Sequence, residues 1–140
     1  MKKSSLFSVV MLVLFSFVMV VPTFAKTNQY SFTMEKRAVN GSDLGKYYTL
    51  SKGSAKISGS QWEAKKLPNA KGPNLVYYEL RNKTTGNSFG TVTSRPNANG
   101  SSNKVSGTFK GLGGGNKYYL FIYKIEIDGR HLKGSGKVYN

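Results

Sequence analysis

Residues 118–127 read YYLFIYKIEI, and this stretch decides the fold class. Leu120 and Ile122 point to one face of an extended chain, because successive side chains of a strand alternate between its two faces. The other face carries Tyr119, Phe121, Tyr123, Ile125 and Ile127. An extended run with apolar residues on both faces predicts a strand in the middle of a sheet or between two layers.

Weaker alternation of the same kind fills the rest of the chain. The further segments predicted as strands are residues 30–35, 46–51, 54–58, 75–81, 88–93, 104–110, 130–133 and 137–139. No segment after residue 25 has apolar residues at helical spacing over three turns. We therefore predict an all-β fold, a single antiparallel β-sandwich of about seven or eight strands.

Proline, glycine and asparagine mark the connections between these strands. Residues 65–74 and 94–103 are predicted as loops, since both hold residues that block regular pairing. The Asp128-Gly129 pair is typical of a two-residue hairpin turn. It predicts that the chain returns after residue 129 to pair with the strand before it.

The start of the chain has the pattern of a secretory leader. After a Lys-Lys pair, residues 6–21 form a run of 16 residues that is apolar except for two serines. Pro22 follows, then a small-residue site that ends at Ala25. A membrane anchor is the alternative, but a spanning helix needs about 20 apolar residues. We expect residues 1–25 to be a signal peptide and residues 26–140 to form one secreted, extracellular domain, and the leader resembles those of Gram-positive bacteria.

Residues 109–122, FKGLGGGNKYYLFI, resemble one corner of a fibronectin type III-like or immunoglobulin-like β-sandwich. In that corner a leucine precedes a glycine-containing turn and a tyrosine begins the next strand. The resemblance implies that Leu112 comes before the turn. It also implies that the phenol of Tyr118 or Tyr119 hydrogen-bonds to the backbone upstream. Such a match implies a fold and no activity.

The composition excludes several kinds of active site. One His and no Cys rule out a Cys–His nucleophile pair, the usual zinc sites and disulfide bonds. His131 is the sole candidate for a catalytic base, but no Gly-x-Ser-x-Gly elbow accompanies it. The glycines at 111 and 113–115 precede a strand, whereas a phosphate-binding loop leads into a helix. We interpret them as a flexible turn between two strands.

Paired carboxylates would be needed for glycoside hydrolysis, and several converging oxygens for calcium. Glu79 and Glu126 lie on strands that could be neighbours, yet a cross-strand salt bridge is the commoner role for such residues. Glu126 and Asp128 share one strand face, but no third carboxylate is near them in sequence. We predict no catalytic residue, no metal site and no cofactor.

Positive charge is the strongest functional signal. The chain has 21 Lys and Arg against 6 Asp and Glu, a formal net charge of +15. Without Lys2 and Lys3 the exported chain keeps 19 basic and 6 acidic side chains, or +13. A charge of about 2–8 suffices for the solubility of a small domain. The excess predicts attraction to anionic partners.

Many lysines lie next to tyrosines in the sequence. Tyrosine rings can stack on sugars or bases while lysines contact phosphates. The alternative is that tyrosines favour half-buried strands and lysines keep sheet edges soluble. The residues that we predict to bind a ligand are Lys46, Tyr47, Lys117, Lys124, Lys137 and Tyr139.

Three functions fit these observations. The first is a secreted, cationic, non-catalytic protein that binds anionic cell-envelope or matrix polymers: wall polymers, acidic polysaccharide or a membrane surface. The second is an antimicrobial, bacteriocin-like protein that acts on target membranes. The third is a small extracellular glycan hydrolase that uses Glu79 and Glu126. Nucleic acid is a further anionic partner, although no recognition motif for it is present. We expect a monomer.

Overall fold

The computed structural model describes residues 25–140, so the predicted signal peptide lies outside the described residues except for Ala25. Within this range the chain forms seven strands and no helix. The strands are β1 (Thr27–Met34), β2 (Ala38–Asn40), β3 (Tyr48–Lys66), β4 (Val76–Asn82), β5 (Ser88–Ser94), β6 (Asn103–Tyr123) and β7 (Arg130–Tyr139). The predicted all-β class is confirmed.

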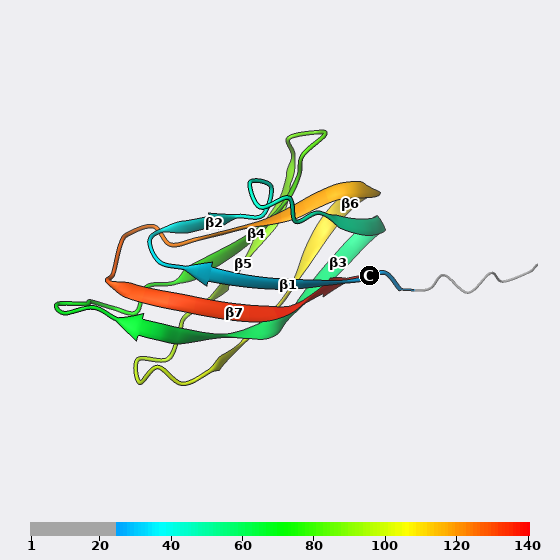
Figure 1. Ribbon diagram of the computed structural model, residues 1–140. Helices are drawn as coiled ribbons and strands as arrows, with labels where there is room; N and C mark the ends of the chain where they lie inside the picture. Colours follow the sequence, from blue (N-terminus) through cyan, green and yellow to red (C-terminus); the bar gives the residue numbers. More distant parts are fainter. Residues whose placement is uncertain (1–24) are drawn as a thin grey trace, which may run out of the picture.

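All seven strands belong to one antiparallel sheet with the order β1-β7-β3-β6-β4-β5, and β2 pairs with β6 beside this path. β6 is the longest strand and has two sets of partners. Its first part pairs with β3, and its last residues pair with β4 and β2. Figure 1 shows β1 and β7 in front of β4 and β5, because the sheet curves back over itself.

The core lies between the two parts of this curved sheet. Tyr30 and Phe32 of β1 are buried, and both rings make edge contacts with the ring of Tyr78 on β4. Burial raises the pKa of Tyr30 to about 12. Gly134 of β7 is required here, because a Cβ at this position would lie 2.4 Å from the Phe32 ring. Alternate residues along β1 and β4 therefore face inward and their neighbours face outward.

The strand predicted at 118–127 is shorter than expected. β6 ends at Tyr123, and the side chains of Ile125 and Ile127 are 59% and 65% exposed. Lys124, the residue directly after β6, is buried, whereas the two isoleucines are exposed. Its burial is possible because its ammonium group has a carboxylate and a carbonyl partner inside the protein. The alternation therefore stops one residue after the strand ends.

The predicted hairpin across Asp128-Gly129 is wrong in its pairing. β7 pairs with β1 and β3, and not with the strand that precedes the turn. The physical reason is that both edges of residues 121–123 are already occupied, by β4 on one side and β2 on the other. Gly129 does adopt the positive φ expected of a turn residue, at 72°.

The glycine-rich segment is also not a turn between two strands. Residues 111–115 lie inside β6, and Gly111, Gly114 and Gly115 have positive φ angles. The register between β3 and β6 shifts beside them, so the glycines bend the strand without ending it. The phenol of Tyr118 accepts a hydrogen bond of 3.0 Å from the backbone N–H of Gly114. This is the kind of contact expected of Tyr118 or Tyr119, and Leu112 is buried beside it.

Candidate functional site

One face of the sheet is basic and free of carboxylates. We define the basic face as the outward side of β1, β7, the second half of β3 and the first half of β6. It consists of Gln29, Ser31, Thr33, Lys56, Ser58, Ser60, Trp62, Lys104, Ser106, Thr108, Lys110, Lys133, Ser135, Lys137 and Tyr139. Buried residues such as Phe32, Ile57 and Val138 alternate with them, which fixes the outward direction.

The strand register spaces the lysines of the basic face apart. Lys133 lies opposite Thr33 and Trp62, and Lys137 lies opposite Gln29 and Ser58. Similarly, the partners of Lys56 are Tyr139 and Thr108, and the partner of Lys104 is Ser60. Like charges directly opposite each other destabilise a sheet, so this arrangement collects positive charge without the closest repulsions. A side chain with hydroxyl, amide or aromatic character separates each of these cations from the next.

A hollow of about 790 Å³ adjoins the basic face at the β1 edge. Its lining includes Lys46, Tyr47 and Lys137, which are three of the predicted binding residues, and contains no carboxylate. Lys46 is held at this edge, because its Nζ donates a hydrogen bond of 3.0 Å to the carbonyl of Ser31. Residues that are far apart in the sequence thus meet in one cationic depression.

The remaining predicted residues divide between two places. Tyr139 lies on the basic face, with the Nζ of Lys137 5.1 Å from its ring centroid. Lys117 lies on β6, and its Nζ is 4.8 Å from the ring centroid of Tyr47. The pairing of lysine with tyrosine is therefore present in space as well as in sequence. It gives each of these ammonium groups a fixed position over a ring.

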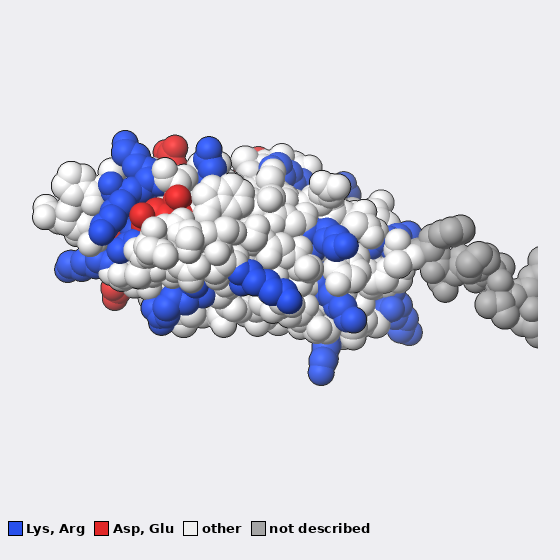
Figure 2. Space-filling view, turned by 90° about the horizontal axis from the view of Figure 1, so that it is seen from below, with Lys and Arg blue, Asp and Glu red and all other residues white. Residues whose placement is uncertain are grey.

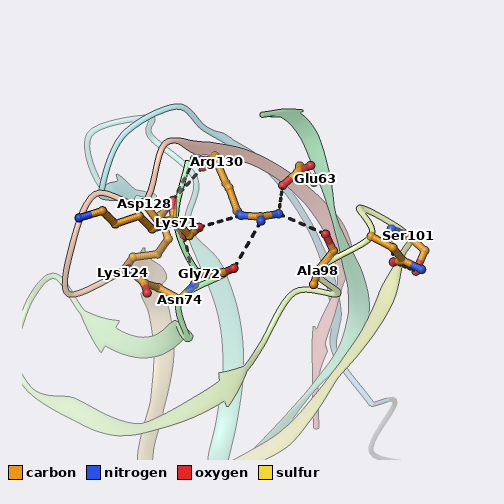
Figure 3. Close-up of polar contacts among 10 residues, drawn as sticks. Glu63, Lys71, Gly72, Asn74, Ala98, Ser101, Lys124, Asp128 and Arg130 are labelled. Atoms are coloured by element: carbon orange, nitrogen blue, oxygen red, sulfur yellow. Dashed lines mark hydrogen bonds and ion pairs between the residues drawn. The ribbon is translucent and has the colours of Figure 1, made fainter. Parts of the chain in front are cut away.

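Lys124 was predicted as an exposed binding residue, and this prediction is wrong. It is 1% exposed, and its Nζ donates hydrogen bonds to the carboxylate of Asp128 at 2.5 Å and to the carbonyl of Arg130 at 2.8 Å. Figure 3 shows this pair beside the guanidinium group of Arg130. A lysine whose charge is compensated inside the protein is not free to meet a ligand.

Asp128 is the acceptor at the centre of this buried cluster. Besides Lys124, the backbone N–H groups of Arg130 and Asn74 donate to its carboxylate, at 3.0 and 3.2 Å. Burial alone would raise the pKa of Asp128. The hydrogen bonds from Lys124, Arg130 and Asn74 and the charge of Lys124 outweigh that effect, so the pKa lies below its ordinary value. The cluster is a structural anchor for this end of the sheet.

A second feature, which the sequence did not predict, lies on the outward side of β4 and the end of β6. We define the aromatic row as Tyr77, Tyr123 and Phe121 together with Arg81. The ring centroids of Tyr77 and Tyr123 are 5.0 Å apart, and those of Tyr123 and Phe121 are 5.2 Å apart. The guanidinium carbon of Arg81 lies 4.2 Å from the Phe121 centroid and completes the stack. Alternation put Phe121 and Tyr123 on the strand face opposite Leu120 and Ile122, but it did not indicate which face is outward, and only the pairing of β4 with β6 brings these rings beside Tyr77.

The candidate catalytic carboxylates have other roles or positions. Glu79 accepts a hydrogen bond of 2.6 Å from Arg81 in an ion pair. Partial burial would raise the pKa of Glu79, but the hydrogen bonds from Arg81 and Ser88 and the charge of Arg81 lower it overall. Glu126 is exposed between β6 and β7, and His131 lies on β7 opposite Lys65.

Among residues 25–140, no three His, Asp or Glu side chains come together in a way that could hold a metal ion. The same part of the chain contains no helix with the length and apolar character needed to cross a membrane.

Comparison with known proteins gives no family for this chain. No protein-family model and no curated protein matches it. One similar solved structure is that of the Drosophila NLP-core, which was described for its pentamer formation and histone binding. The two chains are 9% identical, and the match covers 80% of this chain and 97% of the other. With a TM-score of 0.32, this similarity supports no conclusion about fold family or function.

Proposed function

We propose that this protein is a secreted, non-catalytic binding protein that holds anionic cell-envelope or matrix polymers on its basic face. One observation carries the proposal: five lysines share one outward sheet surface with serines and threonines, and no carboxylate lies among them. Figure 2 shows Lys and Arg along the whole length of the molecule seen from below, with acidic atoms mainly at one end.

Most of the positive charge is free to act on a ligand. Among residues 25–140, ion pairs engage three basic side chains: Arg81, Lys124 and Arg130. The other 16 of the 19 basic side chains in this range form no ion pair there. The field of such a surface draws anionic polymers to it and weakens as salt screens the charges.

The chemistry of the basic face fits a repeating anionic chain. Ammonium groups act as point charges for phosphate or carboxylate, and the neighbouring hydroxyl groups can donate to the same oxygens. Strands lie about 4.8 Å apart and alternate residues about 7 Å apart along a strand, so a polymer can meet several lysines at once. Many weak contacts along one chain then add up to firm retention.

We propose a β-sandwich as the description of this domain. The aromatic contacts between β1 and β4 support face-to-face packing of the two parts of the sheet. The resemblance to fibronectin type III-like and immunoglobulin-like domains stays a prediction based on residues 109–122. Export likewise stays a prediction. Cleavage after Ala25 would leave β1 intact, since this strand begins at Thr27.

The test compares two variants with the same loss of charge. The first replaces Lys56, Lys104, Lys133 and Lys137 of the basic face with serine. The control replaces four exposed lysines elsewhere with serine: Lys36, Lys52, Lys71 and Lys83. Binding of the exported protein to purified anionic wall polymer is measured by co-sedimentation over a range of salt concentrations.

We expect the first variant to bind roughly 100-fold more weakly at low salt, and the control to lose far less. Equal losses would mean that only the net charge matters and would contradict the assignment of the basic face. If the unchanged protein fails to bind anionic polymer at low salt, the whole proposal fails.

A further inference from the structure

Two branched apolar side chains stand in solvent between β6 and β7. Ile125 and Ile127 are 59% and 65% exposed, which makes them, with Leu44, the large apolar residues that the described chain leaves most open. They belong to the segment 124–129, which we call the isoleucine loop. Exposed apolar side chains are ordinary when single, but a pair on one projecting loop indicates a contact surface.

The isoleucine loop is firmly anchored at both ends. Lys124 and Asp128 are buried and bonded to each other, and the backbone N–H of Lys124 donates to the carbonyl of Arg37 at 2.7 Å. At the other end, the backbone N–H groups of Lys71 and Leu67 donate to the carbonyls of Asp128 and Gly129. The outward position of both isoleucines is thus fixed by the buried cluster (Figure 3).

The apolar surface continues from the loop toward the aromatic row. A hollow of about 240 Å³ is lined by Ile125, Leu75 and Tyr77, together with Asn74, Arg95 and Glu126. Tyr77 in turn stacks on Tyr123. Ile125 therefore adjoins an area in which apolar side chains that extend to the aromatic row are mixed with polar groups.

Basic residues are numerous on the segments next to the isoleucine loop. The exposed basic residues on the segments that contact or flank the loop are Lys36, Arg37, Lys65, Lys66, Lys71 and Arg95. The exposed acidic residues there are Glu35 and Glu126, so the surroundings keep a positive balance. In Figure 2, basic and acidic side chains gather at the left end of the molecule.

We propose that the isoleucine loop docks on the surface of an anionic lipid bilayer. Ile125 and Ile127 enter the boundary between headgroups and acyl chains, and the surrounding lysines and arginines meet the anionic headgroups. A bilayer surface offers both an apolar phase and negative charge within a few ångströms, which is the combination that this end of the molecule matches. A wall polymer provides the charge alone, so this surface is separate from the basic face and does not depend on it.

The experiment measures partition of the full protein into vesicles of phosphatidylglycerol mixed with phosphatidylcholine, and into vesicles of phosphatidylcholine alone. The variants are Ile125→Ser, Ile127→Ser and the double substitution. Leu44→Ser is the matched control, because Leu44 is 56% exposed but lies on the turn before β3. All these side chains are in solvent, and a thermal unfolding curve verifies that each variant is folded.

We expect partition into the anionic vesicles to fall about tenfold with each isoleucine lost and to change little in Leu44→Ser. We also expect much weaker partition into the neutral vesicles. Equal binding by the double variant and the unchanged protein would overturn the proposal. So would the absence of binding to anionic vesicles, which is the result that a protein partner for this surface would produce.

A second readout reports insertion directly. Ile125→Trp in a Trp62→Phe background places the one tryptophan of the chain at the tip of the loop. Its emission should shift to shorter wavelength on anionic vesicles if the side chain enters the bilayer. An unshifted emission in a bound protein would contradict insertion. The serine variant of the basic face separates the two proposals, because it should lose polymer binding and keep the effect of the isoleucines.

Discussion

Arg130 connects three separate segments of the chain through one guanidinium group. It donates to the carboxylate of Glu63 on β3, to the carbonyls of Lys71 and Gly72 in the loop before β4, and to the carbonyl of Ala98 in the loop before β6 (Figure 3). Its side chain is nearly buried. Removal of such a residue leaves a buried carboxylate without a partner and several carbonyls without donors.

We therefore predict that Arg130→Ala lowers the free energy of unfolding by about 3–5 kcal/mol. Arg95→Ala is the matched control, since Arg95 is exposed and donates one hydrogen bond, to the carbonyl of Pro73. That substitution should lower the free energy by about 1 kcal/mol or less. Urea unfolding followed by tyrosine and tryptophan fluorescence measures both values, and similar losses would contradict the role given to Arg130.

Asp128 makes the stability of the protein depend on pH. Its pKa in the folded state lies below the ordinary value of 3.8. Its contribution is complete above pH 3.8 and is lost as the pH falls through the lower, folded-state value. Glu79 acts in the same direction from a more exposed position, where solvent reduces its effect.

Asp128→Asn should lower stability at neutral pH by about 3 kcal/mol, because it leaves the buried Lys124 without its counter-charge. It should also flatten the loss of stability as the pH falls below about 4, where the carboxylate of the unchanged protein takes up its proton. Asp43→Asn is the control, since Asp43 is exposed and forms no ion pair among residues 25–140. The free energy of unfolding of both variants and of the unchanged protein, measured at a series of pH values, tests this prediction. A curve for Asp128→Asn parallel to that of the unchanged protein would contradict the assignment.

At the scale of the element, β6 shows which features of a strand can be predicted from the alternation of its side chains and which cannot. The alternation of Leu120 and Ile122 with Tyr119 and Phe121 correctly indicated an extended strand with a buried face. It could not indicate the end at Tyr123, because Lys124, which the sequence predicted as an exposed binding residue, is buried directly after the strand. The ion pair that permits this depends on Asp128, a residue predicted for a turn.

The glycines of β6 give a test of the bend in this strand. Gly114 has a φ of 84°, and a Cβ there would lie 3.1 Å from the backbone nitrogen of Lys52. Gly114→Ala should destabilise the protein by about 1–3 kcal/mol, through backbone strain and the close contact. Gly113 has no positive φ and open space around its Cβ position, so Gly113→Ala should change stability by only a few tenths of a kcal/mol.

Thermal unfolding of the two alanine variants measures this difference. A result in which both substitutions are neutral would mean that the strand can straighten, and the bend would then not depend on the left-handed conformation of Gly114. The hydrogen bond from Gly114 to Tyr118 should break in that case, because it joins the two sides of the bend.

At the scale of the whole molecule, the sequence predicted the strands better than their neighbours. β1 and β7 are the first and last strands of residues 25–140, and β1 pairs along its whole length with β7, a contact that no local pattern indicates. The basic face depends on that pairing, since it combines residues of β1, β7, β3 and β6. Net charge indicated an anionic partner. Only the strand order could place Lys56, Lys133 and Lys137 on one surface.

The same positive charge that attracts a ligand also repels itself within the folded protein. Among residues 25–140, 16 basic side chains form no ion pair, and only three acidic side chains without an ion pair are present to offset their charge. Excess charge of one sign destabilises the compact state, and salt screens the repulsion. Added salt should therefore stabilise the folded protein while it weakens polymer binding.

We predict opposite salt dependences for these two properties. The midpoint of thermal unfolding should rise by a few degrees between low salt and about 0.15 M, where the screening length falls to about 8 Å. The serine variant of the basic face has four fewer positive charges and should show a smaller rise. Its polymer binding should also depend less steeply on salt, because fewer cations meet the ligand. If the unchanged protein instead became less stable as salt increased, attraction between its charges would outweigh repulsion. Acidic groups of the protein would then neutralise the charge of the basic face, and little electrostatic attraction would remain for a ligand.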